Sequence, residues 1–155
     1  MSRDVELRFA QGQWDQLYSH LYPGDGREHA AVVLAALVER PGQAPRLLVR
    51  EVLLAADGVD YGTSPEGHGR LSATFINRAI VRARNERLVY MHVHNHGSDR
   101  SVEFSEVDYA SHARGYPALL DIAKGMPVGA LVFGLRSLQV DLWWSKTERG
   151  RLKHC

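Results

Sequence analysis

The segment LVYMHVHNH, residues 88–96, alternates histidines with apolar residues and is rich in Val and Tyr, a pattern that predicts a β-strand. Successive side chains of a strand point to opposite faces, so the three histidines share one face with Tyr90, whereas Met91 and Val93 face the core. Residues two apart on a strand lie about 6.6 Å apart along it, near enough for two neighbouring imidazoles to bind one metal ion. All three could not easily share one ion. The segment therefore predicts a metal site with two histidine ligands.

A carboxylate follows across a short polar loop, in the segment SEVD at residues 105–108. Asp108 is the best candidate for a third ligand, because a catalytic zinc commonly takes three protein ligands and leaves its fourth position to water or substrate. A second interpretation needs no metal, since Ser105-x-x-Asp108 also fits a capping box at a helix start. The two interpretations are compatible. A helix that starts at Ser105 sets Asp108 in its first turn, facing the end of the preceding strand.

The remaining histidines give weaker signals. Asp108 and His112 lie four apart and form an alternative ligand pair, although an exposed polar pair is the more common meaning of this spacing. Four histidines have no partner at metal-ligand spacing, which favours surface or supporting roles: His20, His29, His68 and His154. The chain has no His-Glu-x-x-His segment, so the helix-borne metalloprotease motif is absent and a catalytic carboxylate must come from elsewhere.

The rest of the chain alternates helical and strand patterns. Apolar residues recur at helical spacing before the turn at Pro23–Gly26, and helices are also expected around 72–83 and over Ser105 to about Ala123, with a break near Pro117. Strands are expected over Glu28–Glu39, Leu47–Leu54, Val128–Phe133 and Leu138–Trp144, the first two as an antiparallel hairpin. This order predicts an α+β or three-layer αβα fold, a mixed sheet with helices on its sides. The segment Asp57–Gly69 is expected to be a long exposed loop that contacts substrate.

Length and composition predict one domain over residues 1–155. No apolar run is long enough for a signal peptide or a membrane span, so we expect a cytoplasmic protein with no membrane partner. The lone Cys155 agrees, because no disulfide can form within one chain. The basic end of the chain, residues 146–155, is expected to be a frayed, solvated tail, and no basic stripe with interleaved aromatic residues predicts a nucleic-acid partner.

The order of these residues resembles the JAMM motif of the MPN+ metalloprotease family, and particularly its compact bacterial JAB members. The resemblance rests on four features in this order: a Glu that opens an apolar strand, a distant His-x-His, a loop and Ser-x-x-Asp. Together they span most of the chain. The resemblance implies the MPN (JAB) fold, a mixed curved β-sheet flanked by helices. It also implies that Glu28 is the general acid/base and that Ser105 donates a hydrogen bond to the oxyanion. His94, His96 and Asp108 would bind one Zn²⁺ per chain. A pairing of His92 with His94 would lengthen the loop and fit the family less well.

The resemblance further implies a zinc-dependent, deubiquitinase-like peptidase or isopeptidase. Its substrate would be a ubiquitin-like or sulfur-carrier protein with a C-terminal Gly-Gly tail, and an E1-like enzyme would be a further partner. An extended tail can add as a strand to an exposed sheet edge, with Asp57–Gly69 as the expected clamp. The alternative is a catalytically inactive MPN scaffold that only binds partner proteins. A glutamate such as Glu28 is ordinarily a solvated charge at the start of a strand. The presence of all four residues of the motif, Glu28, His94, His96 and Asp108, favours the enzyme over the scaffold.

Overall fold

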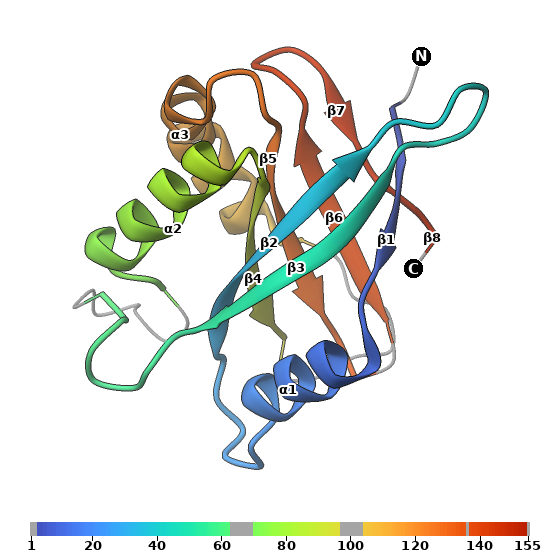
Figure 1. Ribbon diagram of the computed structural model, residues 1–155. Coiled ribbons are helices and arrows are strands. Elements are labelled where there is room, and N and C mark those ends of the chain that lie inside the picture. The colour runs from blue at the N-terminus through green and yellow to red at the C-terminus, as the bar shows by residue number, and fades with distance from the viewer. Residues whose placement is uncertain (1–2, 63–69, 97–103, 136, 155) are drawn as a thin grey trace.

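The computed structural model describes residues 3–62, 70–96, 104–135 and 137–154 (Figure 1). The elements follow one another in this order: β1 (Val5–Arg8), α1 (Gln11–Leu21), β2 (Ala30–Val38), β3 (Arg46–Leu54), α2 (Ala73–Glu86), β4 (Val89–Asn95), α3 (Glu106–Ala123), β5 (Val128–Phe133), β6 (Leu138–Trp143), β7 (Arg149–Gly150) and β8 (Leu152–His154). No helix in these described ranges is long and apolar enough to cross a membrane.

The strands form one mixed sheet in the order β7-β6-β5-β4-β2-β3-β1-β8. Its two outermost strands, β7 and β8, are neighbours in sequence, so the chain passes directly from one edge of the sheet to the other. The Val5 N–H donates to the Arg151 carbonyl oxygen at 2.8 Å, and Trp144 Nε1 donates to the Arg3 carbonyl oxygen at 2.7 Å. These bonds bring the edges together, and the sheet becomes a nearly closed barrel.

This architecture corrects the predicted fold class. The chain does not form the α+β or αβα arrangement of the MPN (JAB) fold, with a curved sheet flanked by helices, but a nearly closed mixed barrel of eight strands, with three helices in its described part. The basic end also differs from expectation, because residues 149–154 pair with β6 and β1 instead of fraying. The physical reason is that Gly150 and Leu152 provide inward positions between the charged residues, so this short segment can join both edges.

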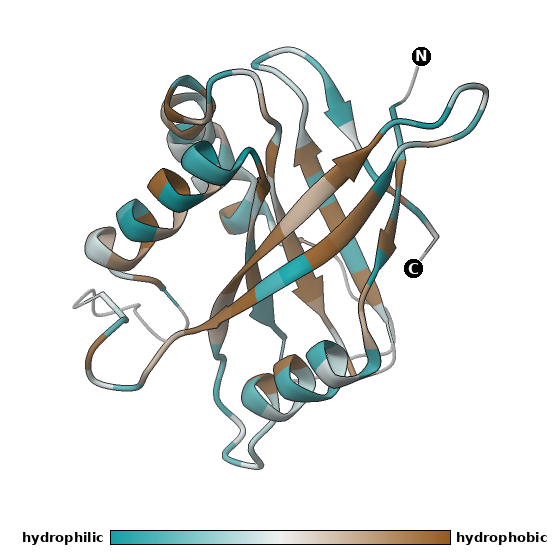
Figure 2. Ribbon diagram, viewed as in Figure 1, coloured by the Kyte–Doolittle hydropathy of each residue, from teal (hydrophilic) through white to brown (hydrophobic). Residues whose placement is uncertain are grey.

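The centre of the sheet positions the histidine strand. β2 pairs antiparallel with β3, which confirms the predicted hairpin, and also with β4, where Ala30 lies opposite His94. β4 pairs in parallel with β5 on its other side. Figure 2 shows hydrophobic residues along β2, whose first half is fully buried. Strands covered on both faces read as continuous apolar runs, which explains the sequence of β2.

The three helices lie at two places. α2 and α3 pack against each other and against β4 and β5, whereas α1 packs against β3 at one end of the barrel (Figure 1). Ser72 caps α2 by accepting a hydrogen bond from the Phe75 N–H at 3.2 Å. The break expected near Pro117 is wrong, because α3 continues through this residue to Ala123. Two buried side chains, Tyr116 before Pro117 and Ala123 after it, hold the helix against the sheet.

Candidate metal centre

Three side chains from two elements meet at the end of β4. His94 Nε2 lies 3.2 Å from His96 Nε2, and each of these nitrogens lies 3.5 Å from Asp108 Oδ2. The pleat brings the two histidines to one face, and the start of α3 brings Asp108 to them. Within the described residues, this is the group of His, Cys, Asp and Glu side chains that is arranged to hold a metal ion. The sequence predicted these three residues as ligands, and the structure brings them together.

The dimensions of this triangle suit a tetrahedral ion. Zinc binds imidazole nitrogen and carboxylate oxygen at about 2.0 to 2.1 Å, so two ligands of a tetrahedron lie about 3.3 Å from each other. The three distances here, 3.2, 3.5 and 3.5 Å, bracket that value. The donor set of two nitrogens and one oxygen also suits zinc better than calcium or magnesium, which prefer oxygen ligands. The residues therefore fit a zinc ion with a fourth position for water or substrate.

The capping box holds Asp108 in place. The Ser105 N–H donates to Asp108 Oδ2 at 2.8 Å, and Ser105 Oγ accepts from the Asp108 N–H at 3.0 Å. Burial alone would raise the pKa of Asp108, but the hydrogen bond and charge of His94 and the bonds from Ser105 lower the pKa below its ordinary value. Asp108 is therefore a carboxylate at neutral pH. The predicted capping box and the predicted metal ligand coexist in one side chain.

Ser105 itself is exposed at the start of α3 and is not among the residues that line the pocket beside the metal centre. Its hydroxyl oxygen is engaged with the helix N-terminus. The described contacts of Ser105 are thus those of a helix cap.

The two histidines differ in their surroundings. The side chain of His94 is 7% exposed, and its Nδ1 has no hydrogen-bond partner in the described part of the chain. His96 is more open, with 26% of its side chain exposed. Its backbone is fixed, because its N–H donates to the Phe133 carbonyl at 2.9 Å and its carbonyl accepts from the Tyr22 hydroxyl at 3.3 Å. Buried His94 and accessible His96 place the centre at the boundary between core and solvent.

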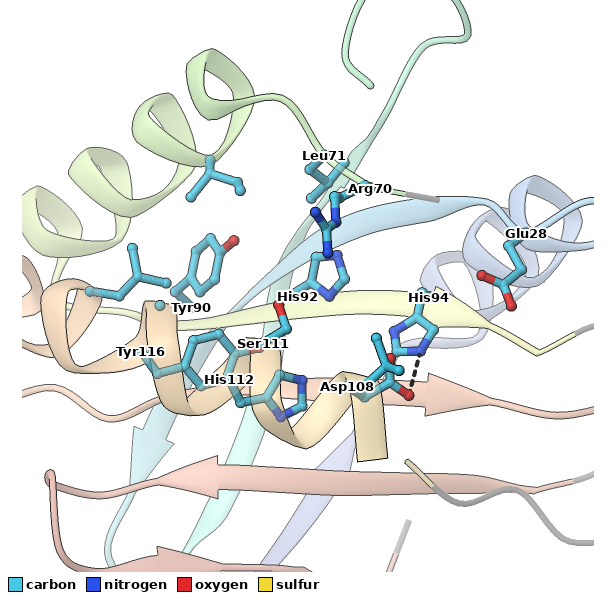
Figure 3. A pocket seen from close by; sticks show the side chains of 14 residues that line it. Glu28, Arg70, Leu71, Tyr90, His92, His94, Asp108, Ser111, His112 and Tyr116 are labelled. Carbon is cyan, nitrogen blue, oxygen red and sulfur yellow. Dashed lines mark ion pairs between the residues drawn. The ribbon is translucent and has the colours of Figure 1, made fainter. Parts of the chain in front are cut away.

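Glu28 lies beside the centre. It precedes β2 by two residues, and the β2–β4 register, continued by those two residues, sets it opposite His96. Figure 3 shows its carboxylate pointing toward the end of the pocket where His94 and Asp108 lie. Glu28 is exposed. A solvent-accessible carboxylate next to the ligands, but outside their triangle, is placed to exchange protons with a water there.

A pocket of about 340 Å³ extends from the centre between β4, α2 and α3. Polar side chains line its middle, including two for which the sequence pattern gives no signal, Arg70 and Ser111 (Figure 3). Its lining also includes apolar side chains, among them Ile76 and Leu119, and the ring of Tyr116. A volume of this size lies at the lower end of the range for small-molecule sites. The pocket therefore has room for a small chemical group next to the candidate metal ligands.

The other histidine of the strand, His92, lines the pocket without joining the triangle. Burial, with smaller contributions from the neighbouring His94 and His112, lowers its pKa to about 3. His92 is therefore a neutral imidazole at neutral pH. It contacts the ring of His94, with 5.6 Å between the centroids. Of the three histidines in this segment, His94 and His96 are the two whose ring nitrogens lie in the triangle with Asp108.

His112 is buried and takes a different partner from the one considered in the sequence. Its Nδ1 lies 2.8 Å from Asp141 Oδ2 on β6, and its ring stacks on Tyr116. Asp141 also accepts a hydrogen bond from Trp143 Nε1 at 3.3 Å. Asp141 is remote in sequence from His112, so the spacing of residues gave no signal for this pair.

His20 and His29 have supporting roles, as expected. His20 Nε2 lies 2.9 Å from the Ala30 carbonyl, and His29 Nε2 lies 2.9 Å from an oxygen of Asp25. Both interactions hold the segment that leads into β2. Glu28 lies in this segment. His68 and the second half of the predicted Asp57–Gly69 clamp lie outside the described residues, as does the side chain of His154.

Comparison with known proteins supports the fold. No protein-family model matches this sequence, and no curated protein matches it. The solved structure of protein DSY2949 from Desulfitobacterium hafniense is similar, with a TM-score of 0.56 and 14% sequence identity over 96% of this chain and 91% of that chain. The STIL N-terminal domain of Trichoplax adhaerens gives a TM-score of 0.46 and 6% identity over 90% of this chain and 41% of that chain, too weak a likeness for any argument. Neither is named as an MPN or JAB protein.

Proposed function

We propose that this protein is a zinc-dependent hydrolase whose metal is held by His94, His96 and Asp108. The observation that carries the proposal is the triangle of ligand atoms, with distances of 3.2, 3.5 and 3.5 Å, beside an accessible carboxylate and a pocket. A metal ion bound there would supply a Lewis acid that makes water available as hydroxide near neutral pH. The chain supplies the ligands, the proton acceptor and the substrate pocket.

Glu28 is the proton carrier in this proposal. Its carboxylate accepts a proton from the attacking water and later delivers it to the leaving amine, so one group serves both halves of the reaction. This role requires a side chain near the metal ligands that is not itself a ligand, and Glu28 meets both conditions. Ser105 belongs to the proposal as an oxyanion donor only through the resemblance of the motif, since its described contacts are those of a cap.

The proposed substrate is a ubiquitin-like or sulfur-carrier protein, cleaved after its C-terminal glycine. One structural feature supports docking of an extended tail: β1 pairs with β3 only over Arg46–Leu48, so the remainder of β3, Val49–Leu54, has no strand partner on that side among the described residues. The Leu54 end of this stretch is separated from β4 by β2 alone. An extended tail can hydrogen-bond to such an edge as an added strand.

A cleavage assay tests the proposal. The substrate is a ubiquitin-like protein whose Gly-Gly end is fused to a reporter peptide, and mass spectrometry identifies the released products. We expect the zinc-loaded protein to cleave after the second glycine, and Glu28→Gln to keep its zinc but lose cleavage. Glu106→Gln, an exposed acid in the first turn of α3, serves as the control with unchanged activity. A Glu28→Gln variant that cleaves at the parental rate would contradict the assignment, and a zinc-loaded parent inert toward all such fusions would favour a binding scaffold.

A further inference from the structure

The side chain of Asn95 bonds to the chain on both sides of Glu28. Its Oδ1 accepts a hydrogen bond from the His29 N–H at 2.6 Å, and its Nδ2 donates to the Arg27 carbonyl oxygen at 3.4 Å. The Asn95 N–H also donates to the His29 carbonyl at 3.4 Å. Asn95 is 1% exposed. One buried amide therefore fixes the two peptide units that flank the proposed proton carrier.

The same residue separates the two histidine ligands in sequence. Because side chains alternate along β4, His94 and His96 point to one face and Asn95 to the other, where it meets Arg27 and His29. The segment before β2 runs beside β4, and both neighbours of Glu28 are hydrogen-bonded to Asn95. Because side chains alternate along an extended segment, the Glu28 side chain points to the other face, toward the ligands. The position of the carboxylate relative to the metal is thus set through one side chain.

We propose that Asn95 is a positioning residue that holds Glu28 at its working distance from the metal ligands, an inference that rests on the proposed function. Other contacts hold the ends of this segment: Asp25 accepts from the Arg27 N–H at 3.0 Å, and the Tyr61 hydroxyl accepts from the Ala30 N–H at 2.9 Å. Asp25 is exposed, so water competes for its bond. Asn95 is buried and contacts both neighbours of Glu28, so its bonds are the ones that define the Glu28 backbone.

The test removes the amide and keeps the branched shape of the side chain. Asn95→Leu removes both hydrogen bonds, whereas Asn95→Asp keeps the size of the side chain and an acceptor for the His29 N–H. A misplacement of about 1 Å can cost about 100-fold in rate. We therefore expect Asn95→Leu to lower kcat by about 10- to 100-fold, with little change in KM or in bound zinc. Asn95→Asp is expected to recover part of this loss, and the exposed Asn85→Leu is the control with parental kinetics.

Two further measurements separate positioning from a general loss of stability. In a Glu28→Gln background, Asn95→Leu should cause no additional loss of residual rate, because the group that it positions is gone. The His29 amide should exchange with solvent faster in Asn95→Leu than in the parent, while amides in the centre of β4 remain protected. This exchange measurement needs no activity. It therefore tests whether Asn95 holds the backbone around Glu28 even if the parent proves inert and the proposed function fails. Parental kcat in Asn95→Leu, or unchanged exchange at His29, would overturn the inference.

Discussion

At the scale of the residue, Asp108 links the start of a helix to the candidate metal centre. Its Oδ2 accepts from the Ser105 N–H and faces both histidine nitrogens, while its own N–H donates to Ser105 Oγ. The capping box and the meeting of these three side chains could be predicted because both patterns are local, a helix cap and a strand pleat. The sequence could not predict the bonds of Asn95 to residues 27–29, since these partners are distant in the chain and unrelated by any spacing.

A substitution at Ser105 separates its capping role from a catalytic one. Ser105→Ala should lower the free energy of unfolding by about 1 kcal/mol, as measured by urea denaturation, because the Asp108 N–H loses its acceptor. Ser105→Asn should restore most of the stability, since Asn is a comparable N-cap. If the hydroxyl also donates to the oxyanion, activity stays low in both variants. Parental activity in Ser105→Asn would limit Ser105 to the cap.

At the scale of the element, local patterns predicted most of the secondary structure but missed β1. The apolar run of β2, the alternation of β4 and the caps of α2 and α3 each carry their signal within a few residues. β1 is only four residues long and gains its stability from strands far along the chain, β3 and β8. Its inward residues Val5 and Leu7 are fully buried, and this burial is visible only once the partners are known.

An ion cluster ties β1 to the β2–β3 hairpin. Glu6 Oε2 lies 2.8 Å from Arg40 and 3.1 Å from Arg46. The hydrogen bond from Arg46 lowers the pKa of Glu6 below 4.5, with partial burial opposing and Arg40 adding to the decrease. A carboxylate with a lowered folded pKa stabilises the fold above its unfolded pKa, and this contribution is lost as the pH falls through the folded value.

Glu6→Gln tests this cluster. We expect the variant to have a lower urea midpoint than the parent at pH 7, and the difference to shrink as the pH falls below about 4.5, where the unfolded carboxyl binds protons and the folded one increasingly does so. Glu39→Gln is the control, because its pair with Arg3 is largely exposed and such pairs contribute little. A difference between Glu6→Gln and the parent that is constant with pH would show that ionisation of Glu6 is not involved.

At the scale of the whole molecule, residues 149–154 decide the architecture. The predicted layered fold has an open sheet. The pattern of residues in the sequence cannot show that the short strands β7 and β8 lie at opposite edges of one sheet and join them. Gly150 is the tightest point of this closure, because an added Cβ would meet the Arg3 carbonyl oxygen and would lie 2.7 Å from Trp144 Nε1. The same two groups share a hydrogen bond. The space at Gly150 is therefore required for the edges to meet.

Gly150→Ala should strain this closure and lower the free energy of unfolding by about 1 to 3 kcal/mol, measured by thermal or urea denaturation. Gly12→Ala is the matched control, since nothing lies near its added Cβ and alanine is the better helix former in α1. Its stability should equal or exceed that of the parent. A Gly150→Ala variant as stable as Gly12→Ala would mean that the edges separate without cost.

The proposed function requires one metal ion between the end of β4 and the start of α3. Elemental analysis after dialysis against zinc tests it most directly, with Asp108→Ala compared with His112→Ala, whose histidine pairs with Asp141 outside the triangle. We expect about one zinc per chain in the parent and in His112→Ala, and loss of zinc in Asp108→Ala. An equal zinc content in Asp108→Ala and the parent, or a folded parent without zinc, would contradict the proposed metal site.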